Sequence, residues 1–217
     1  LTLGGPPQTI VSANANAGFS IVKFKKKLGS SVAEKIHHGL SAAPNMILLK
    51  RTGGSEDWYV YHTSLGNAAR VQLNSSDAKT TGTNVWGQTN PSATVFTVES
   101  FNAGNAIAYC FHDVSGYQKF GSYTGNGGNR AITGLGFKPD FLIIKSTGSG
   151  SWMMYDSVRD VSVGDNAGTA NARPYLIANN NGKENGATNS NVNLDSDGFS
   201  MNTSSGDLNT NGQLYIY

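Results

Sequence analysis

The stretch that decides the fold occurs twice: His38-Gly-Leu-Ser-Ala-Ala-Pro-Asn-Met-Ile-Leu-Leu-Lys50 and Thr133-Gly-Leu-Gly-Phe-Lys-Pro-Asp-Phe-Leu-Ile-Ile-Lys145. The two segments align without a gap, 95 positions apart. In each of them a proline precedes a continuous apolar run, which is Met46–Leu49 in the first copy and Phe141–Ile144 in the second. A proline can begin a strand without removing a hydrogen bond of the sheet. A short apolar run is typical of a strand that is covered on both faces. The segment therefore predicts a central strand in each copy.

The repetition extends outward from this segment on both sides. An aromatic stretch follows it in each copy, Trp58–Tyr61 in the first and Trp152–Tyr155 in the second. Because Trp58 and Trp152 recur at matching positions, both are expected to pack in the core or between sheets. Further matches, in the same order, join Phe24 to Tyr123, 71–74 to 176–179, 95–98 to 198–201, and 105–109 to 213–217. Matching landmarks in the same order indicate a repeated structural unit. The chain is therefore predicted to be a duplication, with copies at 18–115 and 116–217.

The composition indicates that these copies are all-β. The 217 residues include 27 glycines, and only 14% are charged. Glycine and asparagine tolerate the positive φ angles of tight turns between strands, and both are poor residues for a helix interior. We expect one β-sandwich that the two copies share, because no linker rich in proline or serine separates them. Two small sandwiches are the alternative. Residues 1–17 are expected to be a linker or arm.

Charge and residue types argue against several classes of function. The formal net charge is +2, without the clustered basic excess of a general nucleic-acid or membrane-surface binder. The single cysteine, Cys110, excludes an internal disulfide and is expected to be a buried apolar residue. No apolar stretch approaches the ~20 residues that cross a bilayer. His37 and His38 are adjacent and would point to opposite faces of a strand. We therefore expect no metal, no cofactor, no nucleic acid and no membrane insertion.

No catalytic set stands out in the sequence. A Gly-x-Ser-x-Gly elbow between a strand and a helix does not occur. Glycosidases need two opposed carboxylates, and the four glutamates are scattered near predicted turns. Leu194-Asp-Ser-Asp-Gly-Phe199 is better explained as a polar turn than as a calcium loop, because the other ligands and the closing glutamate of such a loop are missing. The chain is not expected to be an enzyme.

The candidate ligand-binding residues are one tryptophan and one run of lysines. Trp86 has no counterpart in the second copy and lies in a polar stretch, so it could stack on a sugar or contact another subunit; its alternative role is to fold back onto the sandwich. Lys25, Lys26 and Lys27 could bind an acidic glycan, a phosphate or a neighbouring subunit. Their alternative role is to form a solvated turn that protects an edge strand.

A resemblance to a known kind of protein rests on several motifs together. They are Val11-Ser-Ala-Asn14, Ala17-Gly-Phe-Ser-Ile-Val22, His38-Gly-Leu40, Trp58 to Tyr61 with His62-Thr-Ser-Leu65, and Lys119-Phe-Gly-Ser-Tyr-Thr-Gly-Asn-Gly127. In this combination the chain from Val11 onward resembles an uncharacterised repeat family in tail-fibre-like and other virion proteins of phages. One departure is that Phe24-Lys-Lys-Lys-Leu28 stands where the second copy has Tyr123-Thr-Gly-Asn-Gly127.

The resemblance implies a fold and a role. The fold would be a jelly-roll or concanavalin-like β-sandwich. The protein would be a structural module of a virion, in a tail fibre or similar appendage, that attaches to a host-surface glycan or assembles subunits. Its partners would be other virion proteins, and it would form a homo-oligomer, with a trimer as one option. A capsid decoration or knob protein and a carbohydrate-binding or carbohydrate-active domain are the alternatives. No catalytic residues are defined for the family.

Overall fold

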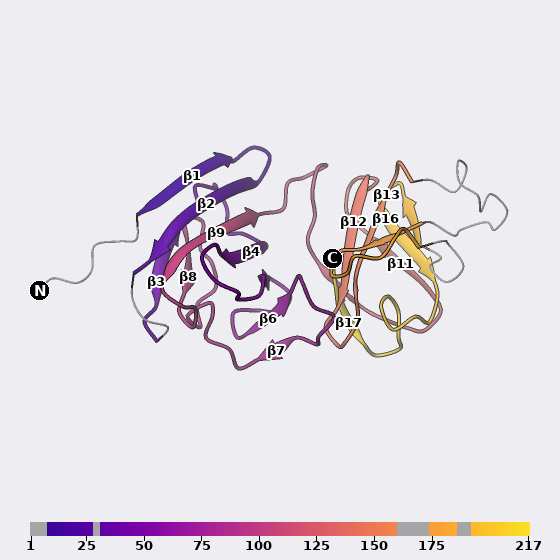
Figure 1. The fold of residues 1–217 in the computed structure, drawn as a ribbon. Coiled ribbons are helices and arrows are strands. Elements are labelled where there is room, and N and C mark those ends of the chain that lie inside the picture. The colour runs from indigo at the N-terminus through magenta and orange to yellow at the C-terminus, as the bar shows by residue number, and fades with distance from the viewer. Residues whose placement is uncertain (1–7, 28–30, 160–173, 186–191) are drawn as a thin grey trace, which may run out of the picture. The chain divides into compact units, whose positions relative to one another are not determined.

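The computed structural model describes residues 8–27, 31–159, 174–185 and 192–217, and no helix occurs in these ranges. The all-β fold that the composition predicted is therefore confirmed. The strands, shown in Figure 1, are β1 (Thr9–Asn14), β2 (Phe19–Lys26), β3 (Glu34–His37), β4 (Met46–Arg51), β5 (Tyr59–His62), β6 (Ala69–Gln72), β7 (Thr80–Thr81), β8 (Val95–Val98), β9 (Gly104–Phe111), β10 (Ser122–Thr124), β11 (Asn129–Thr133), β12 (Phe141–Ser146), β13 (Trp152–Asp156), β14 (Leu176–Ile177), β15 (Val192–Asp195), β16 (Gly198–Asn202) and β17 (Leu214–Ile216).

The chain divides into two compact units. Unit 1 comprises residues 1–73 and 79–120, and unit 2 comprises 74–78 and 121–217. In unit 1 the larger sheet has the order β1-β2-β9-β4-β5-β6-β7, and β3 pairs with β8 in a smaller sheet. In unit 2 the larger sheet has the order β10-β17-β12-β13-β14, and the smaller one has the order β11-β16-β15. All pairings between these strands are antiparallel.

The duplication predicted from the sequence is confirmed by the strand order. The series β2-β9-β4-β5-β6 of unit 1 corresponds, strand for strand, to β10-β17-β12-β13-β14 of unit 2. Matching aromatic pairs also pack alike. Phe24 meets Phe96 edge to face with ring centroids 6.2 Å apart, and Tyr123 meets Phe199 in the same way at 6.0 Å. The two copies therefore share both the topology and a central packing contact.

Each unit has its own hydrophobic core. The buried residues of one cluster come from the segment between Val22 and Cys110, both included, and those of the other come from the segment between Tyr123 and Tyr215, both included. The sequence favoured a single interior shared by both copies, and the structure differs from this: it corresponds to the alternative of two smaller units. The physical reason is strand pairing, because β4 pairs with β9 of its own copy and β12 pairs with β17 of its own copy.

The N-terminal segment also differs from the expected arm. Residues 1–7 lie outside the described residues. Strand β1 (Thr9–Asn14), however, pairs antiparallel with residues 19–24 of β2, from Thr9 opposite Phe24 to Asn14 opposite Phe19. Strand β1 is thus the edge strand of the larger sheet of unit 1. Its side chains are mostly exposed, so the alternation that marks a half-buried strand is weak in this part of the sequence.

The apolar runs of β4 and β12 are not covered on both faces along their whole length. In β4, Ile47 and Leu49 are buried in the core, whereas Leu48 is only partly buried. In β12, Leu142 and Ile144 are buried, whereas Phe141 is 55% exposed. The prediction of strands covered on both faces was therefore wrong for Leu48 and Phe141. Apolar side chains instead occupy the outer face of the larger sheet in each unit.

Candidate functional site

The outer face of the larger sheet in unit 1 carries two adjoining rows of apolar side chains. Residues directly opposite each other in an antiparallel pair point to the same face, so the register of β2, β9 and β4 defines the rows. They are Phe19–Phe111–Met46 and Ile21–Tyr109–Leu48. Side chains that face the core alternate with them along β9, where Ala106, Ala108 and Cys110 are buried. The sheet therefore has an apolar face on each side.

A groove of about 550 Å³ lies on this outer face. Five aromatic residues line it: Phe19, Trp58, Tyr109, Phe111 and Tyr117. Leu48, Leu73, Ala17, Asn14 and Gln118 complete the lining, so none of the lining residues is charged. A concave, mainly apolar and aromatic surface with a few polar groups is the usual form of a small-ligand site.

Trp58 and Tyr109 form the flat part of this groove. Their rings are stacked, with centroids 6.3 Å apart and an interplanar angle of 24°. Trp58 immediately precedes β5, and its carbonyl oxygen accepts a hydrogen bond of 3.0 Å from the backbone N–H of Leu73. The sequence predicted that Trp58 packs inside the protein. Its side chain is instead only partly buried, unlike that of its counterpart Trp152, which is 2% exposed.

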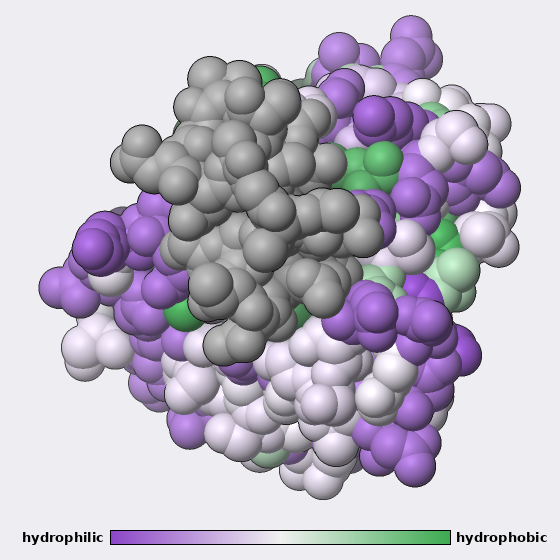
Figure 2. All heavy atoms as spheres, turned by 90° about the vertical axis from the view of Figure 1, so that its right-hand side faces the viewer, coloured by the Kyte–Doolittle hydropathy of each residue, from purple (hydrophilic) through white to green (hydrophobic). Residues whose placement is uncertain are grey.

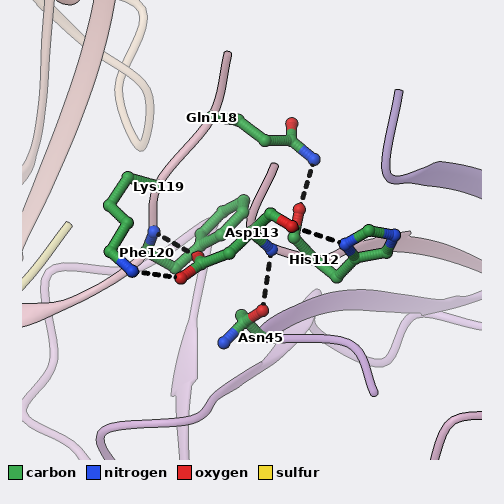
Figure 3. Close-up of polar contacts among 6 residues, drawn as sticks. All are labelled: Asn45, His112, Asp113, Gln118, Lys119 and Phe120. Atoms are coloured by element: carbon green, nitrogen blue, oxygen red, sulfur yellow. Dashed lines mark hydrogen bonds and ion pairs between the residues drawn. The ribbon is translucent and has the colours of Figure 1, made fainter. Parts of the chain in front are cut away.

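The segment that leads from β9 to β10 forms one wall of the groove. Figure 3 shows how its polar groups hold it. The backbone N–H of Asp113 donates to Oδ1 of Asn45 at 2.8 Å, and Oδ1 of Asp113 accepts from the backbone N–H of Phe120 at 2.9 Å. Lys119 forms an ion pair with the same carboxylate. These contacts define a structure that we call the clip, residues 112–120.

Gln118 attaches the clip to the turn between β1 and β2. Its Nε2 lies 3.1 Å from the carbonyl oxygen of Ala17, 3.0 Å from that of Gly18 and 2.6 Å from that of His112. Gly18 has φ +63°, and a Cβ there would lie 2.6 Å from Gln118 Nε2. The close approach that places Gln118 and Tyr117 at the groove therefore requires glycine at position 18.

Several polar groups at the groove have hydrogen-bonding capacity left. Asn14 uses Oδ1 to accept from the N–H of Ala17, and Gln118 uses Nε2 as described. In the part of the chain that the structure describes, Nδ2 of Asn14, Oε1 of Gln118 and the hydroxyl groups of Tyr109 and Tyr117 make no hydrogen bond within the protein. The groove thus offers both donors and acceptors beside its aromatic rings.

The structure removes Trp86 from the candidate ligand-binding residues. Its side chain is 1% exposed, it packs edge to face on Tyr61 with centroids 5.6 Å apart, and its Nε1 donates to the carbonyl oxygen of Ala69 at 3.1 Å. The residue belongs to the core of unit 1. The expectation that it could stack on a sugar is therefore wrong, because its ring is enclosed on all sides.

The three lysines of the predicted cluster do not act together. Lys26 points into the interior, where it is fully buried, forms an ion pair of 3.5 Å with Glu34 and donates to the carbonyl oxygen of Val32. Lys25 and Lys27 are exposed. Successive residues of a strand point to opposite faces, so the side chains of Lys25 and Lys26 lie on opposite sides of the sheet. Lys26 is therefore a structural residue.

A second hollow lies near the β4–β5 loop, and the carboxylate that lines it is hydrogen-bonded to neighbouring side chains of the protein. Its lining includes Glu56, Tyr59 and Asn102. Oε1 of Glu56 accepts from Nδ2 of Asn102 and from Nη1 of Arg51, both at 2.7 Å. The hydrogen bond from Asn102 and the contacts with Arg51 lower the pKa of Glu56 below its ordinary value. This carboxylate is thus held in its ionised form and is unsuited to donate a proton near neutral pH.

The described residues contain no group of three or more His, Cys, Asp or Glu side chains arranged to hold a metal ion. Within the same ranges, no helix has the length and apolar character to cross a membrane. Figure 2 shows one side of the molecule, where hydrophilic residues make up most of the coloured surface and apolar residues occupy small separate areas.

The site and the fold thus define an all-β, internally repeated domain with an aromatic groove on its first repeat. Residues 4–217 match the family described as a domain of unknown function, DUF7483, and the chain belongs to that family. No curated protein and no solved structure matches it.

Proposed function

We propose that the chain is a glycan-binding structural module and that the groove of unit 1 is its binding site. The observation that carries the proposal is the stacked pair Trp58 and Tyr109 on an open outer sheet face. The C–H groups on one face of a sugar ring are apolar and pack on an aromatic ring, whereas its hydroxyl groups point sideways. Unused donors and acceptors at the edge of the groove suit those hydroxyl groups.

The proposal places this module in a phage virion, as part of a tail fibre or similar appendage. The sequence motifs that resemble tail-fibre-like repeats support this location, as does the repeated, turn-rich β fold. Attachment to a host-surface glycan would then be the role of the groove.

The proposed activity is binding without a chemical step. Several carboxylates of the described residues support this view because they form ion pairs within the protein. These pairs are Glu34 with Lys26, Glu56 with Arg51, and Asp156 with Arg159. A retaining or inverting glycosidase needs two opposed carboxyl groups at its sugar site, and the groove is lined by none.

The test is binding of the purified chain to a glycan array, followed by calorimetry with the sugars that bind. The variant Trp58→Ala is expected to bind about 30-fold more weakly, because loss of a central aromatic anchor costs about 2 kcal/mol or more. Phe141→Ala is the matched control, since it removes an exposed aromatic side chain outside the groove. Circular dichroism of both variants checks that they fold.

Four results would overturn parts of the proposal. Absence of binding to any glycan, or equal binding by the wild type and Trp58→Ala, would exclude the groove as a sugar site. Release of free sugar from a bound glycan would exclude binding without chemistry. Labelled antibody that decorates the capsid of the phage particle, and not its tail, would favour the decoration protein instead.

A further inference from the structure

The outer sheet face of unit 1 continues beyond the groove as a basic surface. The next row across the strands is Ile10–Lys23–Ile107–Lys50. Lys25 lies one step further along β2, on the same face as Lys23. The aromatic end and the basic end are therefore parts of one continuous face.

Lys50 differs from the two exposed lysines of β2, Lys23 and Lys25, in its contacts within the protein. Nζ of Lys50 donates to the carbonyl oxygen of Glu56, which holds it at the β4–β5 loop. Lys23 and Lys25 are both exposed. In the ranges that the structure describes, neither of them has a carboxylate partner in an ion pair. Two cations are thus free to meet a ligand.

The register places Lys23 within reach of a ligand that stacks on Tyr109. Lys23 is opposite Ile107, so Tyr109 is its diagonal neighbour on β9. Diagonal neighbours on one sheet face are about 7–8 Å apart, within reach of a long side chain. The ammonium group stands on a flexible four-carbon stem, so it can reach a substituent of the stacked sugar or of the sugar next to it.

From this arrangement we infer that the ligand of the groove is an anionic glycan, whose carboxylate or sulfate group is bound by Lys23 and Lys25. This inference rests on the proposed function. The groove itself has no charged lining residue, and the exposed cations Lys23 and Lys25, together with Lys50 of the same row, supply positive charge beside it. A cleft with charge of one sign raises the local concentration of a ligand of the opposite sign.

The experiment compares oligosaccharides that differ only in charge. An acidic oligosaccharide is measured by calorimetry beside the same compound with each carboxylate reduced to an alcohol, and a sulfated analogue is the second anionic arm. The wild type is expected to bind the acidic form about fivefold more tightly than the reduced form, in keeping with two exposed charge contacts. This preference should decrease with added salt, because exposed charges are screened.

The variant Lys23→Met with Lys25→Met is expected to lose the preference while it keeps the affinity of the wild type for the reduced form. The matched control is Lys35→Met with Lys79→Met, which changes the net charge equally and alters two exposed lysines of unit 1 elsewhere. The control should keep the preference.

The outcomes separate the two proposals. If the wild type binds both forms equally while Trp58→Ala abolishes binding, the groove binds sugars and the inference about charge is wrong. A preference that persists in the Lys23→Met, Lys25→Met variant would also overturn it. If no form binds, both proposals fail. A preference for only the sulfated or only the carboxylated arm identifies which anion the lysines bind.

Discussion

The side-chain nitrogen of Lys145 donates a hydrogen bond of 3.0 Å to the carbonyl oxygen of Asp77, which lies 68 positions earlier in the chain. The carbonyl oxygens of Ser146 and Gly148 are its other acceptors, at 2.8 and 3.3 Å. The side chain is fully buried, and desolvation lowers the pKa of Lys145 to about 8. The N–H of Gly150 donates to Ser76, so 74–78 is bound into unit 2 at two points.

The lowered pKa of Lys145 predicts one contribution to stability that rises with pH between about 8 and 10.5. In the unfolded chain this amine keeps its proton up to about pH 10.5, whereas in the folded chain it releases the proton near pH 8. Between these values the unfolded state binds more protons at this amine, so the contribution of Lys145 to the free energy of unfolding increases with pH, whereas the raised pKa of Cys110 acts in the opposite direction above about pH 9. Urea denaturation at pH 7, 9 and 10 measures the change.

The variant Lys145→Met isolates this contribution, because it cannot titrate at position 145. The free energy of unfolding of the wild type minus that of the variant should increase from pH 8 to pH 10. If the variant does not fold, nuclear magnetic resonance titration of the lysine side chains in the wild type gives the pKa directly. A value near 10.5 for Lys145 would contradict the prediction.

Gly18 and Gly116 provide a matched test of the clip. Both have φ near +70°, at +63° and +73°, so alanine is strained at each. A Cβ at Gly18 would meet Gln118, Val114 and the carbonyl oxygen of His112, whereas a Cβ at Gly116 would meet nothing within 4 Å. Gly18→Ala should therefore lower the free energy of unfolding by about 1–3 kcal/mol more than Gly116→Ala.

Chemical denaturation of both variants measures this difference. Because Gln118 and Tyr117 belong to the clip, Gly18→Ala should also weaken glycan binding at the groove. Equal destabilisation by the two substitutions would show that the clip does not depend on close contact with the β1–β2 turn.

The buried ion pair of unit 1 predicts a large effect when one partner is removed. Lys26→Met leaves the carboxylate of Glu34, which is 7% exposed, without its cation. Loss of one partner of a buried pair costs about 3–5 kcal/mol. The double variant Lys26→Met, Glu34→Gln should recover part of the loss, since glutamine is neutral and still accepts the hydrogen bond from the N–H of Lys27.

Thermal and urea denaturation are suitable measurements for this pair. Lys25→Met is the control on the same strand, and as an exposed substitution it should change the stability by no more than about 0.5 kcal/mol. Similar effects of Lys26→Met and Lys25→Met would mean that Lys26 is not buried.

Cys110 should not react with thiol reagents in the folded protein. Its side chain is fully buried, and desolvation raises the pKa of the thiol to about 12, so the reactive thiolate is scarce at neutral pH. Ellman's reagent should label the protein only after denaturation. Rapid labelling under native conditions would show that the β2–β9 region opens readily.

Much of the fold could be predicted because the duplication appears directly in the sequence. The matched runs at β4 and β12, and the matched aromatics Phe24 and Tyr123, occupy corresponding places in the two units. The division into two cores was not predicted, because strand patterns report which residues are buried and not which strands pair. A continuous apolar run also cannot distinguish a strand buried on both faces from one with an exposed apolar face.

The candidate site was less predictable for a related reason. Trp58 has a counterpart in the second copy and therefore resembled a core residue, whereas Trp86 has none and resembled a ligand-binding residue. In the structure Trp58 lines the open groove whereas Trp86 is buried in the core, because exposure depends on what covers each ring. Alternation along β2 was the signal that could have separated Lys26 from Lys23 and Lys25, since the buried residues of this strand are Ser20, Val22, Phe24 and Lys26.

The short segment 74–78 has a consequence for how such a duplicated chain can evolve. Since these five residues belong to the first copy in sequence and to unit 2 in space, a crossover at the boundary between copies would separate Lys145 from one of its acceptors. Recombination that swaps a whole copy for a diverged one must therefore preserve a backbone contact made far from the crossover point. Exchange of single side chains on the outer sheet faces carries no such constraint, so these faces can diversify by point mutation while the two copies stay together.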